Sequence, residues 1–149
     1  MLYWLTLLSD GGDFFNLFRY ITFRAGGAFL TSLIFGFVFG RPLINLLKRR
    51  QSLGQPIRED GPESHFSKAG TPTMGGALIL GALLVSTLLW ARLDNMFIWV
   101  VLFVTMGFGA IGFADDYSKV SKQNVAGVSG RTRLGLGFLI ALVAAIAAA

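Results

Sequence analysis

Long apolar runs alternate with polar segments along this chain, a pattern typical of proteins that cross a membrane several times. Four such runs cover about residues 21–47, 74–90, 97–114 and 134–149. Each comes close to, or exceeds, the roughly 20 residues that a helix needs to span the hydrocarbon core of a bilayer. The pattern therefore predicts an all-α, polytopic membrane protein with four transmembrane helices. Because no polar residue follows the fourth run, we expect that helix to be truncated.

The first twenty residues differ from these runs because they are interrupted by polar residues and rich in aromatic ones. Residues 1–8 are apolar but lack the basic start and the cleavage site of a signal peptide. Several aromatic side chains favour the interface between lipid and water: Trp4, Phe14, Phe15, Phe18 and Tyr20. We therefore expect an N-terminal interfacial segment that lies on the membrane surface.

The composition indicates that the lipid bilayer itself is a partner of this chain. Hydrophobic residues make up 54% of the chain and charged residues 14%, which is too apolar for an ordinary soluble domain. There is no cysteine, so disulfides and thiolate metal sites are excluded. A net charge of +5 would suit nucleic acid, but the basic residues stand beside apolar runs. We interpret them as determinants of topology and expect no nucleic-acid partner.

The basic residues also predict the orientation in the membrane. The turn 91–95 is so short that the runs on either side must form an antiparallel hairpin, which returns Thr73 and Asp115 to the same side. Ten of the 13 basic residues fall on that side. By the positive-inside bias, residues 48–73 and 115–133 form two cytoplasmic loops.

The first run and the loop after it carry two further signals. Arg41 and Pro42 mark the lower end of the run, and glycine and proline in the loop 48–73 argue against a continuous helix there. A connection of this length is uncommon without a function. Gly36 and Gly40 have the G-x-x-x-G spacing that lets another helix approach closely. We expect packing within the chain, and a homodimer stays open as the alternative.

The third run ends in two adjacent carboxylates, Asp115 and Asp116. If the run is a helix, they lie at its C-terminal end, where the macrodipole disfavours anions by roughly 0.3–1 kcal/mol each. Neighbouring residues on a helix point about 100° apart, so the pair cannot easily chelate one ion and we expect two different tasks. If the helix continues, Lys119 shares a face with the pair, and Lys122 follows three residues later. A surface ion pair worth under about 1 kcal/mol is the alternative.

The surroundings of the pair favour phosphate chemistry. Six basic residues lie in the two loops between Arg58 and Arg133, at the same face as the carboxylates. Mg²⁺ prefers one or two carboxylates together with phosphate oxygens and water, and lysine and arginine neutralise phosphate. This combination suits phosphoryl transfer, in which positioning and charge neutralisation carry most of the catalysis.

Other candidate sites are weaker. The run G-F-G-A-I-G at 107–112 matches a dinucleotide fingerprint, but no acidic residue follows Asp116 and no strand pattern surrounds the run. We reject that site and expect these glycines to permit close helix packing. His65 is the only histidine, so a zinc site is not expected. Lys68 is more suggestive, because the small residues around it permit close approach of an anion.

Two longer motifs resemble a known family. The stretches D-G-P-E-S-H-F-S-K-A-G-T-P-T-M-G-G at 60–76 and G-F-A-D-D-Y-S-K at 112–119 are similar to the phospho-N-acetylmuramoyl-pentapeptide transferases of peptidoglycan synthesis. The resemblance runs from the first span to the end of the chain. It implies transfer of phospho-N-acetylmuramoyl-pentapeptide from its UDP carrier to undecaprenyl phosphate, with release of UMP. It also implies Mg²⁺ as cofactor and a multi-pass location in the bacterial inner membrane, with the active face cytoplasmic.

The resemblance further implies roles for single residues. Asp115 and Asp116 match the family's catalytic acidic pair, the first as a base on the lipid phosphate and the second as a contact for metal or substrate. Arg133 stands where many members have lysine, whose geometry differs. The positions expected to bind substrate are Lys68, Thr73, Lys119, Lys122 and Arg133.

By the family's usual length, residues 1–149 form a single membrane domain, the N-terminal portion of a longer transferase. A further aspartate and a histidine-rich loop of the family are missing, so we expect this segment alone to be inactive. Two alternatives stay open. One is a related enzyme that transfers another sugar phosphate to a polyprenyl phosphate, and the other is a non-enzymatic membrane segment that serves transport or protein interaction.

Overall fold

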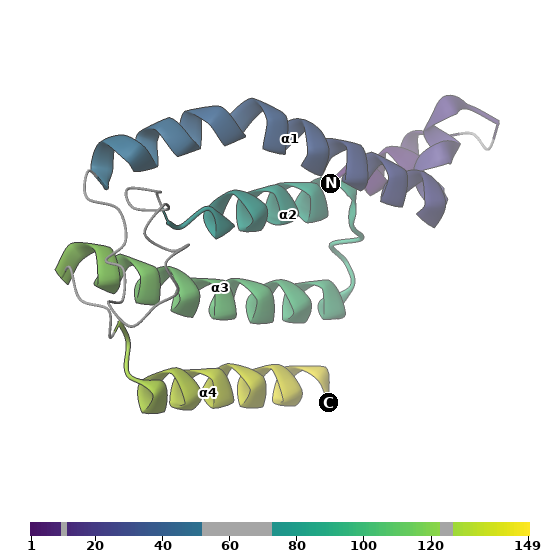
Figure 1. Ribbon diagram of the computed structural model, residues 1–149. Coiled ribbons are helices and arrows are strands. Elements are labelled where there is room, and N and C mark those ends of the chain that lie inside the picture. Colours follow the sequence, from purple (N-terminus) through teal and green to yellow (C-terminus); the bar gives the residue numbers. More distant parts are fainter. Residues whose placement is uncertain (10–11, 52–72, 123–126) are drawn as a thin grey trace.

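A computed structural model describes residues 1–9, 12–51, 73–122 and 127–149 (Figure 1). Two short 3-10 helices come first, η1 (Leu2–Leu8) and η2 (Phe14–Arg19). Four α-helices follow: α1 (Ile21–Arg50), α2 (Gly76–Trp90), α3 (Met96–Lys122) and α4 (Gly130–Ala148). The described segments contain no strand, which confirms the predicted all-α fold.

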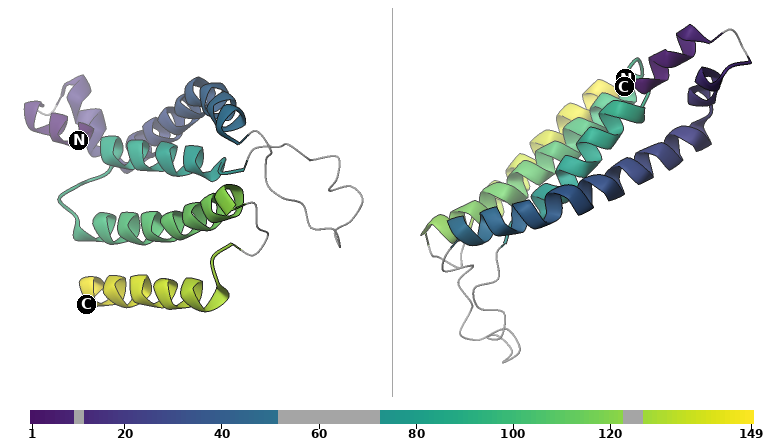
Figure 2. Two further views of the ribbon diagram at one scale, coloured as in Figure 1. Left: turned by 90° about the vertical axis from the view of Figure 1, so that its left-hand side faces the viewer. Right: turned by 90° about the horizontal axis from the view of Figure 1, so that it is seen from above.

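The four α-helices lie in a row in chain order (Figure 1). Each packs against the helices before and after it, so α2 and α3 are the inner members. The chain reverses direction between successive helices, and α1 crosses the others at an angle when seen from above (Figure 2). The carboxyl ends of α1 and α3 therefore lie together with the amino ends of α2 and α4. An end of the row hereafter means one of the two sides on which the helices begin and end. This arrangement confirms the predicted antiparallel hairpin of α2 and α3.

Three of these helices, α1, α3 and α4, are long and apolar enough to cross a membrane. The helix α2 is apolar but has only 15 residues, so it falls short of that length. Large apolar side chains cover the outer surfaces, for example Phe37, which is 78% exposed, and Ile146, which is 70% exposed. Continuous apolar surface of this kind suits contact with lipid and would be a liability in water. The chain is thus part of a multi-pass membrane protein.

The helix α1 begins at Ile21, as predicted, and ends at Arg50, three residues beyond the predicted end of the first run at residue 47. It continues without a break through Arg41 and Pro42, which mark the lower end of the apolar part. A proline removes one hydrogen bond inside a helix, yet three basic residues in the last turn of α1 interact favourably with the dipole at its carboxyl end. The long polar loop consequently begins after Arg50, and its residues 52–72 lie outside the described part of the chain.

The helix α3 extends further than its predicted apolar run, residues 97–114. It runs past Asp115 and Asp116 and ends at Lys122, with Lys119 and Lys122 in its last turn. The aspartates therefore lie more than one turn before the helix terminus. The macrodipole disfavours anions mainly within the last turn, so its effect on these two carboxylates is small. Basic residues occupy that terminus instead. Because the helix continues, the predicted placement of Lys119 on the same face as the two aspartates can apply.

Glycines bring α1 and α2 together. A methyl group added to Gly27 would collide with the Trp90 indole of α2, and one added to Gly40 would lie 3.7 Å from Leu78 of α2. One added to Gly36 would meet nothing within 4 Å. Packing within the chain is therefore confirmed at Gly40, whereas within the described residues Gly36 shows no such close contact. The homodimer stays a hypothesis.

The glycines of α3 act in the same way on its two neighbours. A Cβ at Gly107 would lie 2.9 Å from Ile140 of α4, and a Cβ at Gly109 would lie 2.5 Å from Leu80 of α2. Small residues at such contacts are typical of helix pairs in membranes. The prediction that this glycine run permits close helix packing is confirmed for these two positions.

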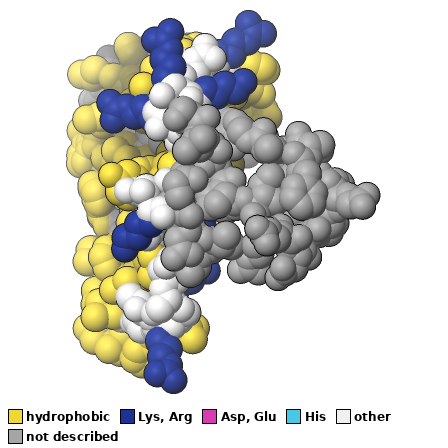
Figure 3. Space-filling model, turned by 60° about the vertical axis from the view of Figure 1, so that its left-hand side comes forward, with side chains coloured by type: hydrophobic (Ala, Val, Ile, Leu, Met, Phe, Trp, Pro, Cys, Tyr) yellow, Lys and Arg dark blue, Asp and Glu magenta, His cyan; other side chains and the backbone are white. Residues whose placement is uncertain are grey.

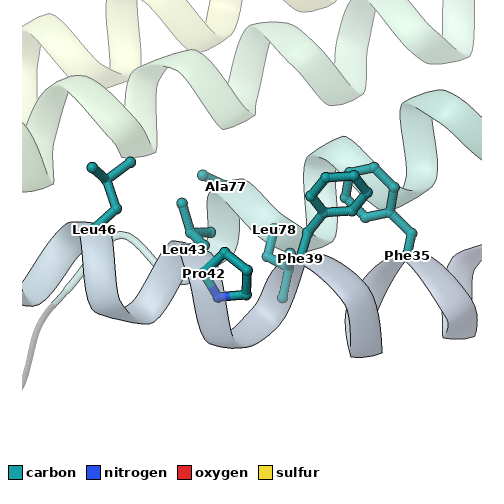
Figure 4. A pocket seen from close by; sticks show the side chains of 7 residues that line it. All are labelled: Phe35, Phe39, Pro42, Leu43, Leu46, Ala77 and Leu78. Carbon is teal, nitrogen blue, oxygen red and sulfur yellow. The ribbon is translucent and has the colours of Figure 1, made fainter.

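An apolar groove of about 330 Å³ lies between α1 and α2 near the end where the polar residues gather (Figure 4). Its lining is entirely uncharged: Phe35, Phe39, Pro42, Leu43, Leu46, Ala77 and Leu78. A charged phosphate has no partner on such a surface. The candidate site for phosphate chemistry therefore has to lie elsewhere at this end.

The N-terminal segment contacts the end of the helices opposite to the one where the polar residues gather. The Met1 ammonium donates a hydrogen bond to the Leu88 carbonyl oxygen over 3.0 Å. The Tyr3 ring lies 5.0 Å from the Arg24 guanidinium and 4.7 Å from that of Arg92, both within cation–π range. These contacts tie η1 to α1 and to the turn after α2. Its location on a membrane surface stays a prediction.

Arg92 has a second partner in the turn between α2 and α3. Its Nη2 donates to Asp94 Oδ2 over 2.7 Å, and this hydrogen bond holds the pKa of Asp94 below its usual value. Asn95 Oδ1 accepts a hydrogen bond from the Phe97 amide, which satisfies a donor in the first turn of α3. The turn is thus closed by local contacts and keeps α2 and α3 antiparallel.

Candidate functional site

Basic side chains are spread over the end of the row where α1 and α3 end and α2 and α4 begin (Figure 3). They come from the last turns of α1 and α3 and the first turn of α4: Lys48, Arg49, Arg50, Lys119, Lys122, Arg131 and Arg133. The expected gathering of basic residues at one end is confirmed for these seven. The membrane face that this end meets stays a prediction.

Asp115 is the centre of a buried polar cluster at this end, with only 7% of the residue exposed. Its Oδ2 accepts a hydrogen bond from Lys119 Nζ over 2.8 Å, one helical turn further on. Its Oδ1 accepts from the Val128 amide over 2.8 Å and lies 2.7 Å from Arg133 Nη2 of α4. A buried charge is tolerated when it is paired in this way. The predicted shared face of Asp115 and Lys119 is confirmed, but the pair is not an exposed surface pair.

Gly127 makes this cluster geometrically feasible. Its backbone has φ of +60°, in the left-handed region that glycine adopts without a steric penalty. A Cβ added there would collide with Asp115 Oδ1 and would lie 2.7 Å from Lys119 Cε. The backbone can therefore pass over the carboxylate and present the next amide, that of Val128, only if residue 127 has no side chain.

Asp116 faces a different set of partners. Its Oδ2 accepts a hydrogen bond of 2.9 Å from Thr73 Oγ1, which lies just before α2. Thr73 is held in turn by Gln51, the residue after α1, because its amide donates to Gln51 Oε1 over 2.9 Å. Gln51 is buried and also donates to Met74 Sδ over 3.3 Å. One chain of contacts therefore joins the ends of α1 and α3 to the start of α2.

The two aspartates thus serve different neighbourhoods, as their 100° separation on a helix predicts. Asp115 is engaged toward α4 and Asp116 toward α2. Within the described ranges, no group of three or more His, Asp or Glu side chains could hold a metal ion. A metal held only by protein side chains is therefore not supported there. Mg²⁺ that is bound mainly by phosphate oxygens needs just one or two carboxylates, and the partly exposed Asp116 can supply one.

The remaining predicted positions differ in how closely they join this site. Lys119 is mostly buried, with 19% of its side chain exposed, while 51% of the Arg133 side chain is exposed. Arg133 therefore keeps further guanidinium donors open to a ligand at the same time as it binds Asp115. Lys122 lies in the last turn of α3 and is exposed. Lys68 lies outside the described residues.

Three residues of the site were not predicted from the sequence: Gln51, Gly127 and Val128. Gly127 could have been suspected, since a glycine in a polar segment often marks positive φ. The sequence around Gln51 does not predict a role in the site, because the residue follows three basic residues and resembles part of a solvated helix end. Val128 takes part through its backbone amide, which no side-chain pattern reveals.

Comparison with known proteins adds to this geometry. A family model, phospho-N-acetylmuramoyl-pentapeptide-transferase signature 1, matches residues 68–80, which include Thr73 and the start of α2. A protein of Ruegeria sp. (strain TM1040) with the name phospho-N-acetylmuramoyl-pentapeptide-transferase is 78% identical over 98% of this chain. Proteins of the same name from Ruegeria pomeroyi and Dinoroseobacter shibae are 75% and 72% identical over 98% and 97% of the chain. The chain belongs to the phospho-N-acetylmuramoyl-pentapeptide transferase family.

The similarity covers only part of each relative. The chain spans 41% of the length of the two Ruegeria proteins and 40% of that from Dinoroseobacter shibae. The resemblance inferred from residues 60–76 and 112–119 is thereby confirmed at the level of the family. The described part of the acidic site lies in the portion that these relatives share with the chain.

Proposed function

We propose that this chain forms part of an enzyme that transfers phospho-N-acetylmuramoyl-pentapeptide from its UDP carrier to undecaprenyl phosphate and releases UMP. The observation that carries this proposal is the cluster of two differently engaged carboxylates and basic side chains at one end of the helix row. The names of the three relatives support the reaction type. By the positive-inside bias, the site faces the cytoplasm from the inner membrane.

The cationic side chains are suited to bind the phosphate groups of both substrates. Arg133 presents a planar set of donors that matches phosphate oxygens, and Lys119 supplies a compact charge beside it. Lys122 adds a third charge at the carboxyl end of α3. Lys68 belongs to this set by its place in the matched motif alone. These charges would offset the repulsion between two anionic substrates.

The bond changes in this reaction are simple. A phosphate oxygen of undecaprenyl phosphate forms a bond to the phosphorus that carries the sugar, and the bond from that phosphorus to UMP breaks. This can occur in one displacement or through a covalent intermediate. In either case, neutralisation of the phosphate oxygens is the main task for the protein. Asp116 accepts a hydrogen bond from Thr73, and its carboxylate would hold Mg²⁺ at this end of the helices.

Mg²⁺ is part of this proposal. Bound by Asp116 and phosphate oxygens, it would neutralise charge on the transferring group. Thr73 would then fix the direction of the Asp116 carboxylate, since its hydroxyl holds one of the two oxygens. That leaves the other oxygen of Asp116 for the ion.

The test is an assay of UMP release in lipid with both substrates, using a full-length chain that contains this segment. Release that requires undecaprenyl phosphate and falls by at least about 100-fold in Asp116→Asn supports the proposal. Release with another UDP-sugar but not with the muramoyl substrate would indicate the related transferase. Ion movement in liposomes that depends on Asp116, without UMP release, would indicate a transporter. We expect residues 1–149 alone to release none.

A further inference from the structure

We infer that Asp115 is a positioning residue that acts through Lys119 and Arg133, and that it does not itself touch the substrate. This inference rests on the proposed function above, because it concerns how the phosphate-binding cations of that reaction are held. It differs from the role that the family resemblance implies for the first aspartate. Its basis is the set of contacts that surround one buried side chain.

Three partners already occupy the Asp115 carboxylate. A carboxylate offers about four lone-pair positions, and Asp115 uses three of them for Lys119, Val128 and Arg133. Only 7% of the residue is exposed. A substrate group could bind Asp115 directly only by displacing one of these charge-assisted partners.

Asp115 brings together two cations from different helices. Lys119 comes from α3 and Arg133 from α4, and both lie within 2.8 Å of the same carboxylate. Without an anion between them, two cations this close would repel each other. Asp115 therefore allows two positive charges to stand side by side where phosphate is to bind. The combined charge of the three groups is about +1, which remains attractive to an anion.

Asp115 also holds the backbone just before α4. The Val128 amide donates to Asp115, and Gly127 leaves room for this approach only because it has no side chain. Asp115 thus also fixes the start of the segment that leads through Ser129, the N-cap of α4, to Arg133. The carboxylate sets both the charge and the location of Arg133. Asp115 therefore positions the residues of the binding surface without being exposed on that surface itself.

The experiment compares Asp115→Asn and Gly127→Ala with the wild type in the full-length chain. If Asp115 positions the cations, both variants should raise KM for the UDP-linked substrate by about 10-fold, the scale of one lost charge-assisted contact. Their kcat should fall by less than about 3-fold, because no group that touches the reacting atoms is removed. A fall in kcat of about 100-fold or more in Asp115→Asn, with unchanged KM, would overturn the inference.

A double-mutant cycle makes the test independent of the size of either single effect. Arg133→Gln should add little to the loss in kcat/KM once Asp115→Asn is present, because residues that contact each other are coupled. Lys122→Gln provides the matched control, since Lys122 has no ion pair with Asp115 and its effect should multiply with that of Asp115→Asn. Multiplicative losses for the Arg133 pair as well would contradict the inference.

A measurement without substrate separates this inference from the proposed function. Hydrogen exchange at the amides of residues 127–133 should become at least about 10-fold faster in Asp115→Asn and in Gly127→Ala, because the anchor of that segment is lost. Unchanged exchange would overturn the positioning role even in an active enzyme. If the wild type releases no UMP, the proposed function fails, and the exchange data still decide whether Asp115 holds this segment.

Discussion

Thr73 Oγ1 donates a hydrogen bond of 2.9 Å to Asp116 Oδ2, which joins the residue before α2 to a carboxylate near the end of α3. The two residues are 43 positions apart in the chain. Because Gln51 holds the Thr73 backbone, the direction of the Asp116 carboxylate depends on three helices. The second aspartate is therefore oriented by tertiary contacts and not by its own helix alone.

The Thr73 hydroxyl should be required for this orientation. We expect Thr73→Val to lower kcat/KM for UMP release by about 10-fold, the equivalent of one hydrogen bond to a charged acceptor. Thr73→Ser keeps the hydroxyl and should stay within about 3-fold of the wild type. Both are measured in the full-length chain. Equal losses in the two variants would show that the methyl group, and not the hydrogen bond, matters.

Gln51 should contribute to stability. Gln51→Ala leaves the partly buried Thr73 amide without its acceptor, and such a loss destabilises by about 1–3 kcal/mol. We expect a lower midpoint of thermal unfolding in detergent. Asn45→Ala, at an exposed position on the same helix, is the control and should change the midpoint little. If the two variants unfold alike, the contacts of Gln51 are not important for the fold.

Adjacent glycines on α1 allow a test of helix packing. A Cβ at Gly27 would collide with the Trp90 ring, while a Cβ at Gly26 would meet nothing within 4 Å. An indole ring is rigid, so Gly27→Ala should destabilise by about 1–3 kcal/mol through overpacking. Gly26→Ala should be neutral or stabilising, since alanine favours a helix more than glycine does. Thermal unfolding of the two variants decides this, and a reversed order would mean that α1 and α2 pack differently.

Much of this architecture follows from local sequence. The short turn around Asp94 predicted the hairpin of α2 and α3, and the four-residue spacing predicted the contact of Lys119 with Asp115. The end of α3 was misjudged because its apolar run stops at Ala114, whereas the helix continues with polar residues to Lys122. Hydropathy marks where a helix enters lipid and does not mark where its hydrogen bonds end.

The site itself was only half predictable. The acidic pair and the basic residues carry chemistry in their side chains, so a pattern of residue types reveals them. Gln51 and Gly127 matter because of what the fold brings beside them, namely Thr73 in one case and Asp115 in the other. Those contacts join segments 22 and 12 positions apart, respectively. No local period encodes them.

The orientation in the membrane leads to the last prediction. Because the chain lacks cysteine, a single introduced cysteine gives an unambiguous signal. Ser121→Cys, at the exposed end of α3, should be protected from an impermeant thiol reagent added outside intact cells. Met96→Cys, at the other end of the same helix and 59% exposed, should react. After the membrane is permeabilised, Ser121→Cys should react as well, which shows that protection came from sidedness and not from burial. The physical reason is the cluster of basic residues around Ser121, since such clusters remain on the cytoplasmic side during insertion. Reaction at Ser121→Cys in intact cells would place the acidic site outside, where UDP-linked precursors made in the cytoplasm could not reach it, and would contradict both the topology and the proposed function.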